Sequence, residues 1–113
     1  MRMNSYTKGD VVVLEPEGKI MPGTDTGALD EKLYALLGQG QKKVIIDLGK
    51  TAWVGSSALT ILLHHNCKFK ESGGSLKLAG LTRKIQQLIV VTKLVLVFEV
   101  YDTLEDALDS FKK

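Results

Sequence analysis

The sequence reads Val44-Ile45-Ile46-Asp47-Leu48 near its middle, a compact apolar run that a short loop joins to Gly55-Ser56-Ser57. Such a run is typical of a strand buried on both faces of a sheet. Apolar residues then recur at helical spacing, which predicts a helix from the serine pair to about Glu71, closed by Ser72-Gly73-Gly74. Its inward face would carry Leu59, Leu62, Leu63, Asn66 and Phe69.

The N-terminal side continues this alternation of strands and helices. A β-branched run at residues 11–14, continued by Ile20, predicts a strand, and Pro22-Gly23 ends it. Thr24-Asp25-Thr26 is expected to cap a helix, because leucines follow at three- to four-residue spacing. These leucines are Leu29, Leu33, Leu36 and Leu37.

The C-terminal side shows the same pattern. Residues 75–81 predict a strand, and residues 82–91 predict a helix with Ile85, Leu88 and Ile89 inward. Residues 94–100 predict the last strand, unless Leu94 and Val95 belong to the preceding loop. Thr103 is expected to cap a final helix with acids in its first turn. The apolar stripe of that helix is Leu104, Ala107, Leu108 and Phe111.

These elements predict an α/β fold with a mostly parallel sheet of four to five strands and about four helices. The length of 113 residues fits a single domain over residues 1–113. A hydrophobic share of 44% and a charged share of 25% are usual for a globular protein. Cys67 is the only cysteine, which excludes a disulfide scaffold and fits a reducing compartment.

Charge and hydropathy exclude two classes of partner. The net charge of +2, from 15 basic and 13 acidic residues, is too balanced for nucleic-acid binding by bulk electrostatics. The N-terminal residues are polar where a signal peptide needs an apolar core. Polar residues such as Gln86, Lys93 and Glu99 interrupt the most apolar region. We therefore expect a cytoplasmic protein without direct membrane insertion.

Motifs for catalysis and metal binding are missing. No glycine-rich nucleotide loop follows a strand. Ser56 and His64 are eight residues apart on one predicted helix, so they cannot meet as members of a hydrolytic triad with Asp47. His64 and Cys67 alone do not make a metal site, and we expect His64 and His65 to be surface histidines beside a small buried thiol. No catalytic residue, metal or cofactor is predicted.

Two further features are interpreted as ordinary structure. Trp53 is predicted to pack, or to lie at the rim of a surface, rather than to anchor a partner. Five cations in the second half of the chain are scattered around two elements, which favours a solvated face over a phosphate-binding patch. They are Lys68, Lys70, Lys77, Arg83 and Lys84.

The serine pair at the predicted helix start allows two interpretations. A serine N-cap accepts hydrogen bonds from free amides of the first turn, which would explain one serine or both. An exposed serine there also accepts a phosphate, whose charge of about −1.5 to −2 suits the positive end of a helix. Such a phosphate would block a partner docked on this surface without unfolding the protein.

In order and spacing, these segments resemble the STAS domain of bacterial anti-sigma factor antagonists, over nearly the whole chain. The resemblance includes Gly18-Lys19-Ile20, the strand at residues 44–48 and the serine motif about seven residues later. It continues through Gly73-Gly74 before Leu76-Lys77-Leu78, and through Ile85-Gln86-Gln87-Leu88. It closes with Thr103-Leu104-Glu105-Asp106-Ala107-Leu108.

The resemblance implies a small mixed sheet covered by helices mainly on one face, and a regulatory role without catalysis. Family members bind an anti-sigma factor, a serine kinase with a histidine-kinase-like ATPase fold, and so release the sigma factor. The kinase phosphorylates a serine at the start of the second helix, which breaks the complex, and a serine phosphatase restores it.

The family motif Asp-Ser-Ser/Ala-Gly-Leu maps onto Gly55-Ser56-Ser57-Ala58-Leu59. The resemblance therefore implies phosphorylation of Ser56, with Ser57 as the second choice. It also implies that this segment contacts the partner, with Met21 and Trp53 at its rim.

Two positions depart from the family pattern. Gly55 stands where the acid before the serine is usual, and Met21 stands where an acid is usual three residues after Gly18. Both acids lie near the phosphorylation site in the family. Their absence keeps an alternative open, in which the chain is a non-phosphorylated STAS subunit of a signalling scaffold or of a membrane transport complex.

Overall fold

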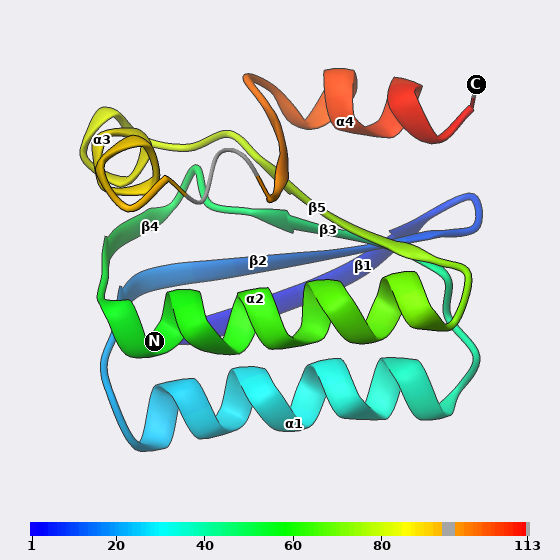
Figure 1. Ribbon diagram of the computed structural model, residues 1–113, viewed down its shortest axis with the longest axis horizontal. Helices are drawn as coiled ribbons and strands as arrows, with labels where there is room; N and C mark the ends of the chain where they lie inside the picture. The colour runs from blue at the N-terminus through cyan, green and yellow to red at the C-terminus, as the bar shows by residue number, and fades with distance from the viewer. Residues whose placement is uncertain (94–96, 113) are drawn as a thin grey trace.

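The structure is a computed structural model that describes residues 1–93 and 97–112. A sheet lies between α1 and α2 on one side and α4 on the other, with α3 beside β4 (Figure 1). The strands are β1 (Arg2–Lys8), β2 (Val11–Ile20), β3 (Lys43–Asp47), β4 (Thr51–Val54), β5 (Ser75–Ala79) and β6 (Glu99–Tyr101). The helices are α1 (Thr24–Gly38), α2 (Ser56–Glu71), α3 (Arg83–Val91) and α4 (Leu104–Phe111).

The sheet is mostly parallel and runs in the order β1-β2-β3-β5-β6, while β4 pairs with β2. Only the β1–β2 pair is antiparallel among the strands of the described residues. The long strand β2 pairs first with β3, from Val12 to Leu14, and then with β4, from Gly18 to Ile20. The register shifts directly after Gly18, whose φ of 89° is easily adopted only by glycine.

The alternation of side chains along β2 divides the core into two clusters. Val12 and Leu14 belong to the large cluster that the sheet shares with α1, α2 and α3, whereas Val11 and Val13 belong to the smaller cluster under α4. The helices α1 and α2 therefore cover one face of the sheet and α4 the other, while α3 lies beside β4 and adds Ile85 and Ile89 to the large cluster. The largest side chains that are fully buried include Leu29, Leu33, Leu62, Phe69, Leu76, Leu78 and Ile89.

The predicted fold class, the four helices and the cap at Thr103 are confirmed, whereas Gly23 takes the N-cap position of α1 and Thr24, Asp25 and Thr26 form its first turn. The Thr26 hydroxyl accepts a hydrogen bond from the Gly23 N–H at 3.0 Å, and the Thr103 hydroxyl accepts one from the Asp106 N–H at 3.1 Å. β1 and β4 were not predicted, because both are short or half exposed and show no clear alternation. The predicted strand at residues 94–100 is confirmed at its end by β6, while Leu94 and Val95 lie outside the described residues.

Three side chains contradict the expectations from sequence. Lys77 is buried rather than solvated, and its Nζ donates to the Ser110 hydroxyl at 2.6 Å and lies 4.1 Å from the centre of the Phe111 ring. The Cys67 thiol is exposed, whereas His65 is fully buried, with its Nε2 2.6 Å from an Asp30 carboxylate oxygen. Because they lie between elements, Lys77 helps to hold α4 on the sheet and His65 helps to join α2 to α1.

Candidate partner-binding site

The ends of two parallel strands bring distant residues together at one edge of the sheet. Ile20 is the register partner of Val54, so β2 and β4 end side by side. Met21 follows β2 and is half exposed, and Gly55 follows β4. The two positions at which the family acids are absent are therefore neighbours at the start of α2.

Ser56 is the first residue of α2, but it does not cap the helix. Gly55 takes the N-cap position in an extended conformation, and its carbonyl oxygen accepts from the Leu59 N–H at 3.2 Å. Within residues 1–93 and 97–112, no side chain makes a capping hydrogen bond at this end of α2. The interpretation of the serines as caps is therefore wrong, because Gly55 takes the N-cap position and both serines lie inside the helix. Ser56 and Ser57 are both exposed.

Trp53 lies against the backbone just before Ser56. A Cβ atom built on Gly55 would lie 2.7 Å from Cη2 of the indole and 3.4 Å from Cζ2 and Cζ3. The indole is still 40% exposed. Trp53 thus packs and lies at a rim, as expected from the sequence, and it occupies the space that a side chain at position 55 would fill.

The remaining members of the serine motif lie below the surface. Ala58 and Leu59 are buried in the large core cluster. The surface beside Ser56 is instead a hollow of about 190 Å³ between α2 and the end of α3. Its lining is largely apolar and consists of Ser56, Leu59, Thr60, Leu63 and Thr92.

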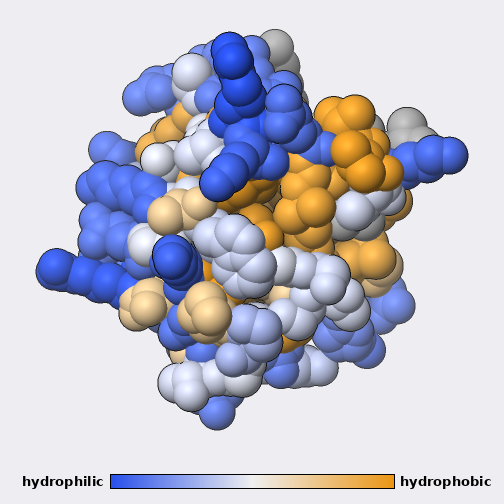
Figure 2. Space-filling model, turned by 90° about the vertical axis from the view of Figure 1, so that its left-hand side faces the viewer, coloured by the Kyte–Doolittle hydropathy of each residue, from blue (hydrophilic) through white to orange (hydrophobic). Residues whose placement is uncertain are grey.

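A second apolar region, which the sequence analysis did not identify, continues from β4 onto α3. One hollow of about 260 Å³ lies between β4 and α3 and includes Trp53 and Lys84. The next, of about 390 Å³, is lined by α3 alone and includes the strongly exposed Val90 and Val91. Figure 2 shows this end of the molecule, where apolar side chains gather between hydrophilic ones. The only signal in the sequence was the pair of valines outside the inward face of the helix.

The family profile of the STAS domain matches residues 2–107. The chain belongs to the STAS domain family. This STAS domain is 25% identical over 84 residues to BtrV of Bordetella bronchiseptica, a candidate anti-sigma factor antagonist. That alignment covers 74% of this chain and 72% of the relative.

Solved structures confirm the STAS fold. A candidate anti-sigma factor antagonist from Thermotoga maritima matches with a TM-score of 0.92 at 20% identity, over 98% of this chain and 95% of that one. The Bacillus anti-sigma factor antagonist SpoIIAA matches at 15% identity in two forms. Its unphosphorylated form has a TM-score of 0.78 over 98% of both chains, and its phosphorylated form has one of 0.77 over 97% of this chain and 99% of that one.

The electrostatics of the STAS domain favour negative charge at the start of α2. The first turns of α2 and of α3 contain no acidic residue, and each lies at the positive end of a helix dipole. The Thr82 hydroxyl accepts from the Ile85 N–H in the first turn of α3, whereas the first turn of α2 has no such cap among the described residues. Arg83 and Lys84 are exposed on the first turn of α3. A phosphate or a carboxylate of a partner would be attracted to this end of the molecule.

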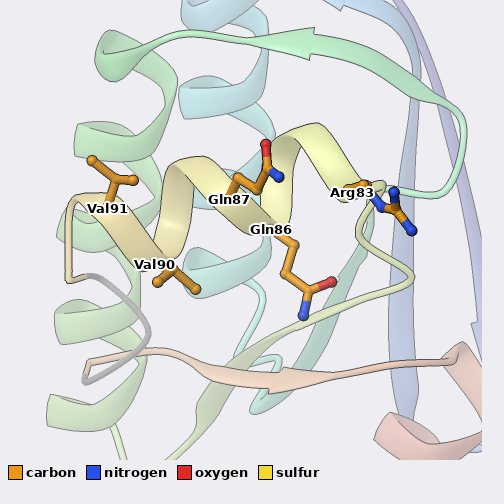
Figure 3. A pocket seen from close by; sticks show the side chains of 5 residues that line it. All are labelled: Arg83, Gln86, Gln87, Val90 and Val91. Atoms are coloured by element: carbon orange, nitrogen blue, oxygen red, sulfur yellow. The ribbon is translucent and has the colours of Figure 1, made fainter.

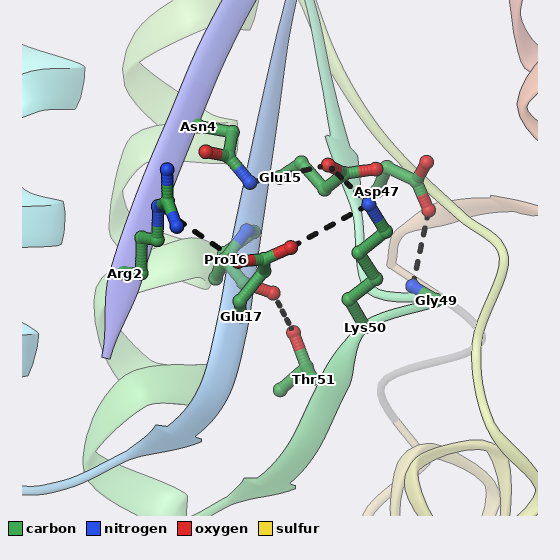
Figure 4. A network of polar contacts seen from close by, with 9 residues as sticks. All are labelled: Arg2, Asn4, Glu15, Pro16, Glu17, Asp47, Gly49, Lys50 and Thr51. Carbon is green, nitrogen blue, oxygen red and sulfur yellow. Dashed lines mark hydrogen bonds and ion pairs between the residues drawn. The ribbon is translucent and has the colours of Figure 1, made fainter.

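A polar network at the bend between β3 and β4 holds β4, and with it the start of α2, in place (Figure 4). Lys50 Nζ lies 3.4 Å from a carboxylate oxygen of Glu15 and 3.5 Å from one of Glu17. The negative charge of Glu15 is the largest cause that raises the pKa of Lys50, and Glu17 adds to it. The Thr51 hydroxyl donates to the carbonyl oxygen of Pro16 at 2.8 Å. These contacts tie the beginning of β4 to β2.

The structure does not assemble the hydrolytic or metal sites that were considered. Asp47 accepts from the Gly49 N–H at 3.0 Å, and His64 Nε2 lies 2.9 Å from the Tyr34 hydroxyl, so both bond to residues other than Ser56. Residues 1–93 and 97–112 contain no group of three or more side chains placed to ligate a metal ion. No helix in the described part of the chain has the length and hydropathy to span a membrane.

Proposed function

We propose that this STAS domain is an anti-sigma factor antagonist. It binds an anti-sigma factor, a serine kinase with a histidine-kinase-like ATPase fold, and so releases the sigma factor. Membership of the STAS family and the relatives described as anti-sigma factor antagonists support this role. It acts in the cytoplasm as a single binding domain, without catalysis, metal or cofactor.

Phosphorylation of Ser56 is the proposed switch. The observation that carries it is the position of Ser56, which is exposed on the first residue of α2 and is not engaged in capping. A phosphate there is accommodated by the positive helix end, so the fold persists. The phosphate lies beside the hollow that Leu59 and Leu63 line. A charged, hydrated group there prevents an apolar partner surface from packing against the hollow. A serine phosphatase reverses the modification.

The contact surface consists of the exposed residues around this serine. Met21 and Gly55 stand at the strand ends, Trp53 forms the rim, and Ser56 and Ser57 start the helix. Ala58 and Leu59 support this surface from the core and set its shape. The unphosphorylated and phosphorylated forms of SpoIIAA match this fold nearly equally, which supports a switch that leaves the backbone in place.

The test uses three purified baits in lysate of the source organism: wild type, Ser56→Asp and, as the matched control, Ser5→Asp, which changes an exposed serine of β1 outside the contact surface. We expect wild type and the control to retain a kinase-like ATPase, and Ser56→Asp to lose it. Incubation of the wild-type complex with ATP should release the kinase and add one phosphate, located on Ser56 by mass spectrometry. Retention of the kinase by Ser56→Asp would contradict the switch.

The alternative function is that of a non-phosphorylated STAS subunit of a signalling scaffold or of a membrane transport complex. The observation that favours it is the neighbouring pair Met21 and Gly55, which leaves no acid at either family position. In that case all three baits would retain the same large assembly, and ATP would not release it.

A further inference from the structure

Trp53 and Gly55 form a matched pair that determines the chemistry next to Ser56. The indole lies so close to the α-carbon of Gly55 that a Cβ atom would stand 2.7 Å from the ring. An acidic residue cannot occupy position 55 while Trp53 keeps this place. The contact therefore presents an aromatic face where a carboxylate would otherwise stand.

The apolar surface beside Trp53 is elongated along α3. The hollow that contains Trp53 also contains Lys84, Ile85 and Leu88, and a second hollow, which shares no lining residue with it, is lined by Arg83, Gln86, Gln87, Val90 and Val91 of the same helix. Figure 3 shows Val90 and Val91 on the last turn of α3 and Arg83 on its first. The nine residues of α3 extend over about 13 Å, which matches two to three turns of a second helix.

The charges along this strip have one sign. Arg83 and Lys84 are exposed at its beginning, and Lys93 follows its end. No acidic residue lines either hollow. The first turns of α2 and α3 also lack acids, so the helix dipoles add to the positive potential. A strip that combines apolar side chains and uncharged Gln87 with cations at both ends is complementary to aliphatic side chains flanked by carboxylates.

We propose that the surface formed by Trp53, Arg83, Lys84 and Val91, the tryptophan surface, binds an acidic amphipathic helix of the partner protein. Aliphatic side chains of that helix pack on the indole and on Val91, and its carboxylates pair with Arg83 and Lys84. This proposal rests on the proposed function in that the start of α2 is where the partner docks. It adds the chemistry that selects the partner, with Trp53 as the specificity-determining residue.

Trp53 is the only tryptophan of the chain, so its fluorescence reports directly on this surface. The probe is a short synthetic amphipathic peptide with leucines on one helical face and glutamates on the other. The matched probe has lysine in place of every glutamate. We expect the acidic peptide to shift the Trp53 emission to the blue in a saturable and salt-sensitive way. The affinity for the basic peptide should be lower by at least about tenfold.

Charge reversal supplies the second arm. Arg83→Glu with Lys84→Glu should invert the preference for the two peptides. Lys8→Glu, at the β1–β2 hairpin on the opposite end of the molecule, should leave it unchanged (Figure 1). Equal binding of both peptides, or no binding of either, would overturn the proposal.

The two proposals fail separately. Capture of the kinase together with failure of both peptides would leave the proposed function intact and reject the acidic helix. Binding of the acidic peptide with inverted preference in the reversed variant, but no captured kinase, would support the tryptophan surface and reject the kinase as its partner.

Discussion

Replacement of Ser56 by alanine should leave stability almost unchanged, because its hydroxyl caps nothing. Loss of a serine or threonine N-cap costs typically about 1 kcal/mol. Gly55 holds the N-cap position of α2, and no side chain in the part of the chain that the structure describes makes a capping hydrogen bond there, so this cost does not arise. Alanine is the better helix former by up to a few tenths of a kcal/mol. We expect Ser56→Ala to lie within about 0.5 kcal/mol of wild type.

Ser56→Asp should be slightly more stable than wild type. It adds a negative charge to the first turn of α2, where no acid is present, and a charge of this kind near a helix N-terminus contributes about 0.3–1 kcal/mol. The gain should shrink in high salt, because the site is exposed and screened. The same variant is expected to lose the partner, so stability and binding would change in opposite directions.

The assay is urea unfolding of the variants at neutral pH and low salt, with Thr103→Ala as the matched control. The Thr103 hydroxyl accepts from the Asp106 N–H at 3.1 Å, so its removal should cost about 1 kcal/mol. If Ser56→Ala loses as much as Thr103→Ala, Ser56 is a cap after all. The conclusion that the Ser56 hydroxyl is not engaged in capping, and so can accept a phosphate, would then be wrong.

Three further predictions concern stability. Gly74→Ala should destabilise the protein by about 1–3 kcal/mol, because its Cβ would lie within 3.0 Å of backbone atoms of Lys42, just before β3. Gly27→Ala, in open space on α1, should instead stabilise it by about 0.5–1 kcal/mol. Equal effects of the two substitutions in thermal unfolding would contradict this. Phe69→Ala should cost about 3–5 kcal/mol in urea unfolding, since the ring is fully buried, and a loss below about 1 kcal/mol would mean that the ring is not part of the core. The hydrogen bond from Lys43 lowers the pKa of Asp10, so Lys43→Met should raise that pKa towards its usual range in an NMR titration. The stability from this contact is present above the usual pKa of an aspartate and is lost as the pH falls through the lowered pKa of Asp10. An Asp10 pKa that is the same in wild type and in Lys43→Met would exclude the contact.

Much of the fold could be predicted because hydrophobic spacing directly reflects burial. The run at residues 44–48 and the leucines of α1 lie in the core as expected. His65 could also have been found, since it follows Ala58 and Leu62 along the buried stripe of α2. A polar residue on such a stripe implies a buried partner, and Asp30 supplies it.

The site could be predicted only as a position along the chain. The strand β4 was missed because four residues with two exposed members give no periodic signal. Without β4, neither its pairing with β2 nor the contact of Trp53 with Gly55 follows from the sequence. The capping role of Gly55 was likewise missed, because a glycine carries no side-chain signal and two serines beside it have a higher capping preference.

The contact between Trp53 and Gly55 also constrains how this surface could have changed over time. An acidic side chain at position 55 and an indole at position 53 compete for one volume, so the effect of either substitution depends on the residue at the other position. A lineage that exchanges the acid for the aromatic ring must lose the side chain at position 55 first or move the indole outward. We therefore expect the two positions to vary together among close relatives, with a large aromatic residue at the first only where the second is glycine.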